Sequence, residues 1–464
     1  MILDFREWSE EILSEVVAEK LKHILDLSLK MLEKYPLCDN CLGRQFALLG
    51  FGIGNSERGR SIKMLLAMAA HEMALSPEIK VKEIGVKTLK ILATRGSFKV
   101  ARDLLEKMGR RVGGEEKCFL CEGIFENLQP VIDGTIEKVK EYEFDNFLVG
   151  IKLPVEIEER EDEFKAEFGV QYSESIRNEM SRVIGKEISQ KLNKQVNYMK
   201  PQVVILINPF TGEIDLQVNS LFIVGRYRKL IRGIPQSKWV CIKCGGRGCA
   251  RCNWTGKMYP ESVEELIAKP ILDVTLGEET AFHAAGREDR DARMLGGGRP
   301  FVIEVKKPKR RNVDLKGLER AINEYARGKV EVLDLRFGDK DDVKKLKGAE
   351  GAQKVYRIVI KFDKEIADED LVKIEKELTG VIVRQWTPTR VLHRRADRLR
   401  EKRIYEVKTK RLSADSIEMW VRCQGGLYVK ELVTGDNGRT EPNVSEIINA
   451  RAEPLELDVM EVIV

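Results

Sequence analysis

The stretch HAAGREDRDARMLGGGRPFVIEV, residues 283–305, holds the densest group of chemically useful side chains in the chain. Acidic and basic residues are interleaved in its first half, three glycines follow at 296–298, and the apolar run at 301–305 predicts a strand. A polar, glycine-rich loop that leads into a buried strand suits an active site, whereas composition alone favours a charged surface turn with local ion pairs. The candidate residues are Arg287, Glu288, Asp289, Arg290, Asp291 and Arg293.

Short strands and helices alternate around this stretch through residues 260–464. Strands are predicted at 355–362, 419–424 and 455–464, and helices at 314–327 and 367–377. The N-terminal half has apolar residues at helical spacing within 1–35, a second helix over 97–110, a strand over 147–153 and a helix over 172–195. Two more strands flank the turn at 208–212, so an α/β module is predicted over 55–228. With 464 residues, the chain is long enough for about three domains.

Eight of the nine cysteines occur as CxxC pairs, and only Cys423 stands alone. Two CxxC turns can complete a tetrahedral zinc site, and four thiolates leave no open position, which indicates a structural metal. Iron would also accept thiolates, and redox chemistry is disfavoured because no thioredoxin-like βαβ pattern surrounds a pair. In CIKCGGRGCARC two pairs are adjacent and form a zinc knuckle, whereas the other two pairs must meet through the fold. The pairs are Cys38 with Cys41, Cys118 with Cys121, Cys241 with Cys244, and Cys249 with Cys252.

The composition, with 43% hydrophobic and 33% charged residues, is typical of a globular protein. No apolar run approaches the roughly 20 residues that span a membrane, and the acidic, amphipathic N-terminus resembles no targeting peptide. We therefore expect a cytoplasmic protein with no membrane contact. The net charge is only +5, but residues 384–410 contain ten Lys and Arg against three Asp and Glu, a local charge of 10 − 3 = +7. Such a segment is typical of nucleic-acid binding or of a solvated helix face.

The block GREDRDARMLGGGRPF resembles the catalytic motif of the archaeal tRNA pseudouridine synthases, the tenth family of these enzymes. More widespread tRNA pseudouridine synthases carry a Gly-Arg-Thr-Asp core, and its alignment with residues 286–289 makes Asp289 the catalytic aspartate, with Asp291 as the alternative. Ala292 departs from the valine that is common in the family. Further resemblances follow in the family's order: LCDNCLGRQFALLGFGIGNSERG, then residues 218–239, then 384–407, and finally GGLYVKELVTGDNGRTEPNVSEII.

The resemblance implies an α+β fold in which a THUMP-type RNA-binding domain precedes the catalytic domain. Residues 1–54 would form a helical zinc region that the 118–121 pair completes, and 55–228 the THUMP-like domain. Residues 229–259 would be a linker carrying the zinc knuckle, which is not universal in the family. Residues 260–464 would form a pseudouridine synthase domain with a mixed, largely antiparallel sheet flanked by helices.

The resemblance also implies roles for single residues. Asp289 would act on the ribose as a nucleophile or a base, with Lys430 as its cation. Tyr356 would stack on the target base and assist proton transfer, and Leu432 would floor the pocket. Taken alone, Tyr356 fits an ordinary strand aromatic and Lys430 a surface lysine. No organic cofactor is needed, and the implied substrate is tRNA at positions 54 and 55, bound by a monomeric enzyme.

Basic side chains along the tRNA backbone would offset the cost of drawing a base from its stack. The candidates are Arg287, Arg226, Arg228, Lys229, Arg232, Arg390, Arg394, Arg395 and Arg398. Two other readings stay open. Another THUMP-containing modifier, a methyltransferase or a thiolation enzyme, would need a glycine-rich or phosphate-binding loop, which we do not find after residue 230. A non-catalytic zinc-containing tRNA-binding protein explains the cysteines and the basic segment but not the ordered motifs.

Overall fold

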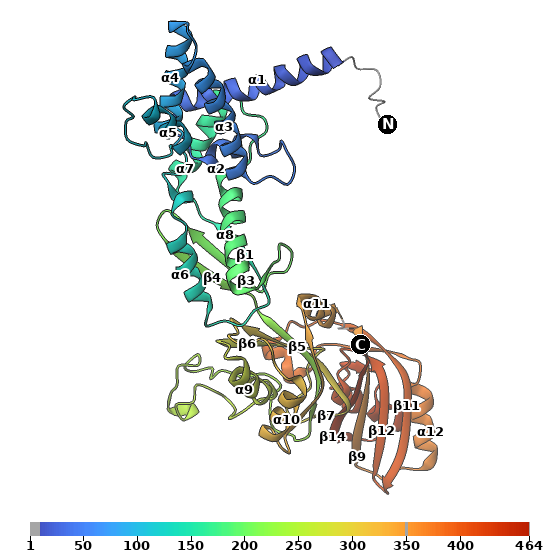
Figure 1. The fold of residues 1–464 in the computed structure, drawn as a ribbon. Helices are drawn as coiled ribbons and strands as arrows, with labels where there is room; N and C mark the ends of the chain where they lie inside the picture. Colours follow the sequence, from blue (N-terminus) through green and yellow to red (C-terminus); the bar gives the residue numbers. More distant parts are fainter. Residues whose placement is uncertain (1–9, 349–350, 464) are drawn as a thin grey trace. The chain divides into compact units, whose positions relative to one another are not determined.

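The computed structural model describes residues 10–348 and 351–463 and divides the chain into two units, Met1–Gln217 and Val218–Val464 (Figure 1). The first unit begins with helices and continues into a small sheet. Its helical elements are α1 (Glu10–Lys34), α2 (Asp39–Gly43), η2 (Arg44–Phe46), α3 (Asn55–Ala74), α4 (Ile79–Thr94), α5 (Lys99–Lys107), η3 (Ile124–Glu126), α6 (Gln129–Val139), α7 (Val155–Phe168) and α8 (Ile176–Leu192). Its strands are β1 (Asn146–Ile151), β2 (Gln195–Val196), β3 (Val203–Asn208) and β4 (Glu213–Val218).

The sheet of the first unit has the order β2-β1-β3-β4, with β1 parallel to both β2 and β3. Helix α8 begins at a typical cap, because the Ser175 hydroxyl accepts a hydrogen bond from the Asn178 amide, and it ends at Asn193 in the left-handed conformation. The α/β character predicted for this region is confirmed.

The second unit contains one large sheet and the helices that cover it. Its strands are β5 (Leu221–Lys229), β6 (Glu279–Ala284), β7 (Arg293–Lys306), β8 (Val330–Gly338), β9 (Gln353–Phe362), β10 (Ile382–Gln385), β11 (Arg400–Ser413), β12 (Ser416–Gln424), β13 (Thr440–Glu441) and β14 (Ala452–Ile463). Its helical elements are η4 (Ala250–Cys252), α9 (Val263–Thr275), α10 (Leu315–Tyr325), α11 (Lys340–Gly348), α12 (Asp368–Leu378), η6 (Thr389–Arg394), α13 (Val429–Thr434) and α14 (Val444–Ile448).

The strand order in this sheet is β13-β10-β11-β12-β9-β14-β7-β5-β8, and β6 pairs with β7. The pairing of β14 with β7 is parallel and joins two otherwise antiparallel halves. Helix α10 packs against β8 and α9. Helix α12 packs against β11 (Figure 1). The mixed, largely antiparallel sheet expected from the sequence is therefore present, and one continuous apolar core underlies it.

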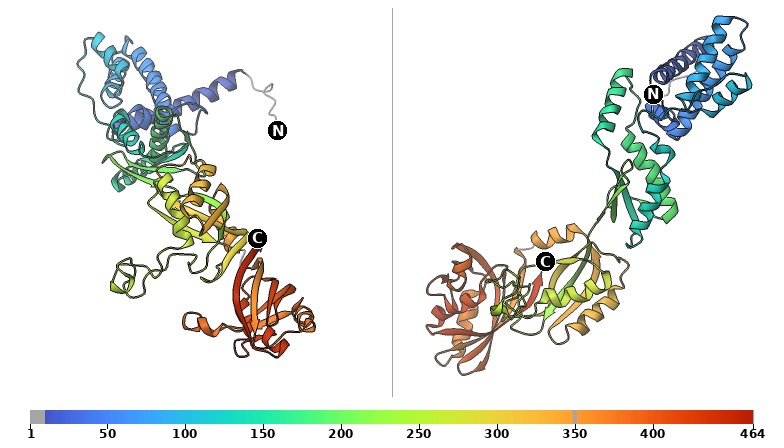
Figure 2. Two further views of the ribbon diagram at one scale, coloured as in Figure 1. Left: turned by 90° about the horizontal axis from the view of Figure 1, so that it is seen from below. Right: turned by 90° about the vertical axis from the view of Figure 1, so that its left-hand side faces the viewer.

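The strand β5 lies inside this second sheet, between β7 and β8, although the expected RNA-binding range of 55–228 included most of it. Its alternating side chains explain the placement, because Ile223 and Tyr227 are fully buried in the second unit's core. Residues 240–258, between β5 and α9, extend away from the sheet and are yellow-green in Figures 1 and 2. Among the described residues no helix is both long enough and apolar enough to cross a membrane.

Candidate active site

The charged stretch singled out in the sequence forms a tight loop, residues 285–292, that joins β6 to β7. The loop is anchored where the Ala285 amide donates to the carbonyl of Pro300 at 3.1 Å. Gly286 has a φ of 84°, in the left-handed region where a residue with a Cβ is strained, so this position favours glycine. The expected glycine loop at 296–298 belongs to strand β7 instead. A Cβ at Gly296 would lie 2.0 Å from the Met460 carbonyl, so this glycine allows β7 and β14 to approach.

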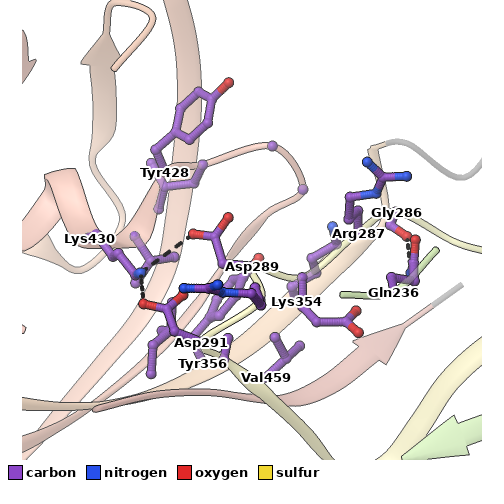
Figure 3. A pocket seen from close by; sticks show the side chains of 18 of the residues that line it. Gln236, Gly286, Arg287, Asp289, Asp291, Lys354, Tyr356, Tyr428, Lys430 and Val459 are labelled. Atoms are coloured by element: carbon purple, nitrogen blue, oxygen red, sulfur yellow. Dashed lines mark hydrogen bonds and ion pairs between the residues drawn. The ribbon is translucent and has the colours of Figure 1, made fainter. Parts of the chain in front are cut away.

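A cavity of about 900 Å³ opens at this loop. Its wall combines the loop with the start of β9 and with the segment that leads into α13 (Figure 3). These three segments are far apart in the sequence and meet only through the large sheet, so the cavity depends on the second unit's fold.

Asp289 lies in this cavity between two cations. Its carboxylate is 3.2 Å from the Arg390 guanidinium and 3.7 Å from the Lys430 ammonium. The side chain is 37% exposed, so a substrate can reach it. Arg390 is held in turn by Glu431, 2.7 Å from its Nε. An ionised carboxylate with two adjacent cations can act on an electrophilic carbon or accept a proton.

Asp291 lies beside Asp289 but is more exposed, at 60%. Lys430 donates to its carboxylate at 2.5 Å and so bridges the two aspartates (Figure 3). Burial would raise the pKa of Asp291, but the hydrogen bond and charge of Lys430 bring this pKa below its usual value. The geometry thus makes Asp291 a holder of Lys430 and leaves the deeper Asp289 facing the cavity.

Tyr356 and Lys354 are two residues apart on β9, so both side chains point to the same face, into the cavity. Burial raises the pKa of the Tyr356 phenol well above its usual value, so it stays protonated. Burial and the nearby Arg299 lower the pKa of Lys354 to about 8. Leu432, which was expected to floor the pocket, is fully buried on α13 and is not among the lining residues. The apolar lining comes from Leu427, Val429, Leu457 and Val459.

All four basic residues that we expected to contact phosphates near 226–232 donate to the protein's own backbone carbonyls. Lys229 is fully buried and donates to the carbonyls of Ile234, Asp289 and Arg290 at 3.0–3.1 Å. Arg232 donates to the carbonyl of Asp291 at 2.8 Å and to the Asp458 carboxylate. Together they support the backbone on which both aspartates stand.

The other two members of this group stand farther along the sheet. Arg226 donates to the carbonyls of Gly297 and Gly298 on β7. Arg228 donates to the Gly296 carbonyl and pairs with Glu331 at 2.9 Å. The sequence could not reveal these contacts, because their partners lie about 70 residues further along the chain.

The remaining basic candidates divide between the catalytic centre and its rim. Arg390 contacts Asp289 and Glu431, so its guanidinium belongs to the catalytic centre. Arg395 lines the cavity and donates to the Tyr428 hydroxyl at 3.1 Å, and Arg287 lines it while donating to Ser237. Arg398 is exposed and does not line the cavity. The side chain of Arg394 lies outside the described part of the chain.

A buried polar cluster supports the loop from behind. Glu288, whose side chain is fully buried, accepts from Arg299 at 2.9 Å and from the Tyr227 hydroxyl at 2.8 Å. Gln236 donates to that hydroxyl and to the carbonyl of Gly286. The interpretation as a charged surface turn is therefore wrong for Glu288, and the cluster fixes the start of the loop.

Two groups of four cysteines are assembled, as the CxxC spacing predicted. Within each group the sulfurs lie within 4.8 Å of one another. The sulfurs of Cys38 and Cys121 lie 3.6 Å apart and those of Cys249 and Cys252 3.8 Å apart, far longer than a disulfide. Four sulfurs bound tetrahedrally to zinc at about 2.3 Å would lie about 3.8 Å apart, so the donor sets fit zinc. The fully used thiolates leave such an ion a structural role.

Several cavity residues escaped the sequence reasoning. Lys354 stands two positions from the expected tyrosine, and strand alternation would have found it. Tyr428 precedes Lys430 in the LYVKEL block, and its ring lies beneath the Arg400 guanidinium at 5.8 Å. Trp239 and Tyr259 flank the zinc knuckle and pack edge to face, with ring centroids 5.5 Å apart. No sequence pattern signalled that these two rings would reach the cavity.

Comparison with known proteins places this arrangement in a family. The family model described as "Pus10, C-terminal" matches residues 222–463, and "Pus10 THUMP domain, archaeal" matches 132–208. The tRNA pseudouridine synthase Pus10 of Methanocaldococcus jannaschii is 44% identical, over 97% of this chain and 96% of its own. Those of Methanothrix thermoacetophila and Thermofilum pendens are 42% and 41% identical, over 95% and 93% of this chain and 94% of theirs.

The fold, the cavity and these matches define a pseudouridine synthase, an isomerase. The THUMP match falls on the first unit and spans its central strands β1 and β3. The chain belongs to the Pus10 family.

Proposed function

We propose that this enzyme isomerises uridine to pseudouridine in the T arm of tRNA, at positions 54 and 55, with Asp289 as the catalytic carboxylate. The observation that carries the mechanism is the position of Asp289 in a cavity, with Arg390 at 3.2 Å and Lys430 at 3.7 Å. The curated relatives are tRNA pseudouridine synthases, which supports tRNA as the substrate. The positions in the T arm rest on the resemblance of the catalytic motif.

The reaction breaks the N1–C1′ bond of uridine and forms a C5–C1′ bond, while the proton on C5 moves to N1. Asp289 can assist as a nucleophile at the ribose or as a base, and the contacts with Arg390 and Lys430 hold its carboxylate in place for either role. The apolar lining residues beside Asp289 would limit the access of water to the opened ribose, because water would capture the carbon that the base must rejoin.

The phenol of Tyr356, whose pKa is raised by burial, can stack on the uracil and donate a hydrogen bond to it. The base must leave its stack to reach this depth, at a cost of a few kcal/mol. Arg287 and Arg395 at the rim would offset this cost through the RNA backbone. Zinc at the two cysteine sites would stabilise the fold and take no part in the chemistry.

The decisive experiment maps pseudouridine in an unmodified tRNA transcript after incubation with wild-type enzyme, with Asp289→Asn and with Asp291→Asn. Carbodiimide-dependent primer-extension stops at 54 and 55 should appear with the wild type and disappear with Asp289→Asn. Asp291→Asn is the matched control, since it removes a neighbouring carboxylate that holds Lys430. It should keep measurable activity. Full activity of Asp289→Asn would contradict the catalytic assignment, and stops outside the T arm would contradict the substrate position. The cytoplasmic location and the monomeric state stay predictions.

A further inference from the structure

The zinc knuckle stands on a short hairpin, residues 239–259, whose two ends reach the catalytic cavity. Trp239 and Tyr259 both line the cavity, and the Met258 amide donates to the Trp239 carbonyl at 2.8 Å. The Cys241 amide donates to the Gly256 carbonyl at 2.8 Å and closes the hairpin below the cysteines. Arg290, the neighbour of Asp289 in the chain, lies over the Tyr259 ring at 5.0 Å. The hairpin is thus joined to the catalytic loop.

The outer end of the hairpin carries positive charge that its own folding does not require. Residues 240–258 contain four Lys and Arg and no Asp or Glu. Lys257 pairs with Glu265 at the base of the hairpin, whereas Lys243, Arg247 and Arg251 are exposed near the cysteines. A concentration of positive charge with no acidic residue in the segment fits a polyanion.

An aromatic side chain accompanies these cations. Trp254 is 76% exposed, and its backbone is in the left-handed region with a φ of 63°. This conformation is unfavourable for a bulky residue, yet its amide is fixed by the Cys249 carbonyl at 2.9 Å. An exposed indole next to several cations is the combination with which proteins stack on unpaired bases and follow the backbone.

We propose that this hairpin is an RNA-binding arm that holds the substrate strand beside the nucleotide drawn into the cavity. Trp254 would stack on an unpaired base, and Lys243, Arg247 and Arg251 would contact phosphates. The inference rests on the proposed function, because Trp239 and Tyr259 at the foot of the arm line the cavity that the uridine would enter.

The test combines kinetics with salt-dependent binding of an unmodified tRNA transcript. The variant Lys243→Glu/Arg247→Glu/Arg251→Glu should raise KM at least tenfold with kcat within about twofold of wild type. The slope of log K against log salt should become shallower by about two, as for the loss of two or three phosphate contacts. Trp254→Ala should weaken binding on the order of tenfold without changing that slope.

A matched control reverses three exposed cations that do not line the cavity, Lys316→Glu/Arg320→Glu/Lys347→Glu. It changes the net charge equally and should leave the slope and KM near those of wild type. Metal analysis of each variant should still give two equivalents, which shows an intact knuckle. An unchanged KM and slope in the knuckle variant, or equal losses in the control, would overturn the proposal. Failure of the proposed function would appear differently, as a wild-type enzyme that modifies no tRNA.

Discussion

Lys229 shows how a residue outside the catalytic motif can set the position of the catalytic aspartate. Its ammonium has three protons, and each meets a backbone carbonyl, two of them those of Asp289 and Arg290. Burial lowers the pKa of Lys229 to about 8, so the group is still mainly protonated at pH 7 and can make all three bonds. Because the aspartate's carbonyl is fixed, its side chain has little freedom relative to Arg390 and Lys430.

We expect Lys229→Met to lower kcat at least tenfold and to lower the free energy of unfolding by roughly 1–3 kcal/mol, because buried carbonyls lose their donors. Single-turnover pseudouridine formation and urea unfolding measure the two effects. Arg226→Met is the matched control, since Arg226 holds carbonyls on β7 instead of those in the loop. It should lose stability and keep kcat. Equal kcat losses in both variants would show that Lys229 is only structural.

Lys354 gives the site a pH dependence whose sign follows from its burial. Its pKa is about 8 in the fold, against 10.5 as its ordinary value, so the unfolded chain binds more protons between these values. The free energy of unfolding should therefore rise with pH across this window, by roughly 2 kcal/mol between pH 7.5 and 9.5 from this residue. Urea unfolding of the wild type and of Lys354→Met at both pH values isolates the contribution of Lys354 to the free energy of unfolding, because the two proteins share all other titrating groups. If the free energy of unfolding rose equally with pH in both proteins, the lowered pKa of Lys354 would be contradicted.

At the scale of elements, the first cysteine site connects two turns that are 80 residues apart. Cys38 caps the start of α2, where its sulfur accepts a hydrogen bond from the Cys41 amide. The Phe119 amide donates to the Pro36 carbonyl at 2.7 Å, so the second turn lies against the first. All four thiols are buried, and a bound metal would add four bonds to the hydrogen bond and the Tyr35–Phe119 ring stack that already join the turns.

We predict that Cys121→Ala reduces bound zinc from two equivalents to one. Hydrogen exchange should accelerate in α2 and at residues 118–126. Strands β1 and β3 should keep their protection, because the hydrogen bonds between them do not depend on the metal. Metal analysis and exchange mass spectrometry make the measurement. Cys423→Ala serves as the control, since this buried cysteine on β12 belongs to neither group. Two equivalents retained in Cys121→Ala would refute a four-thiolate site.

The extent of sequence-based prediction also differs by element. The strands at 355–362 and 455–464 and the helices at 314–327 and 367–377 are confirmed within a few residues, because each has a strong apolar period. The cavity positions of Asp289, Tyr356 and Lys430 followed from short motifs. Lys229 and Arg232 could not be placed, because a charged residue is expected at the surface unless its distant partners are known. The glycines at 296–298 suggested a loop, although they permit close strand contacts.

For the whole molecule, the division into two units changes where the catalytic part begins. The expected boundary at 228 would separate β5 from the sheet in which it lies between β7 and β8. Division at 217 leaves this sheet and its core intact. The THUMP match, residues 132–208, falls entirely on the other side of this division.

We therefore expect residues 218–464 to be soluble when expressed alone and to unfold in one cooperative transition followed by circular dichroism. Residues 230–464, cut near the boundary suggested by the sequence, should aggregate, because β7 and β8 lose the strand between them and the core loses Ile223 and Tyr227. The longer fragment keeps every cavity residue, so its kcat should stay within about tenfold of the full chain while KM for tRNA rises. Equal solubility of the two fragments would contradict the structural boundary. An unchanged KM would instead show that the THUMP-containing unit contributes nothing to substrate binding.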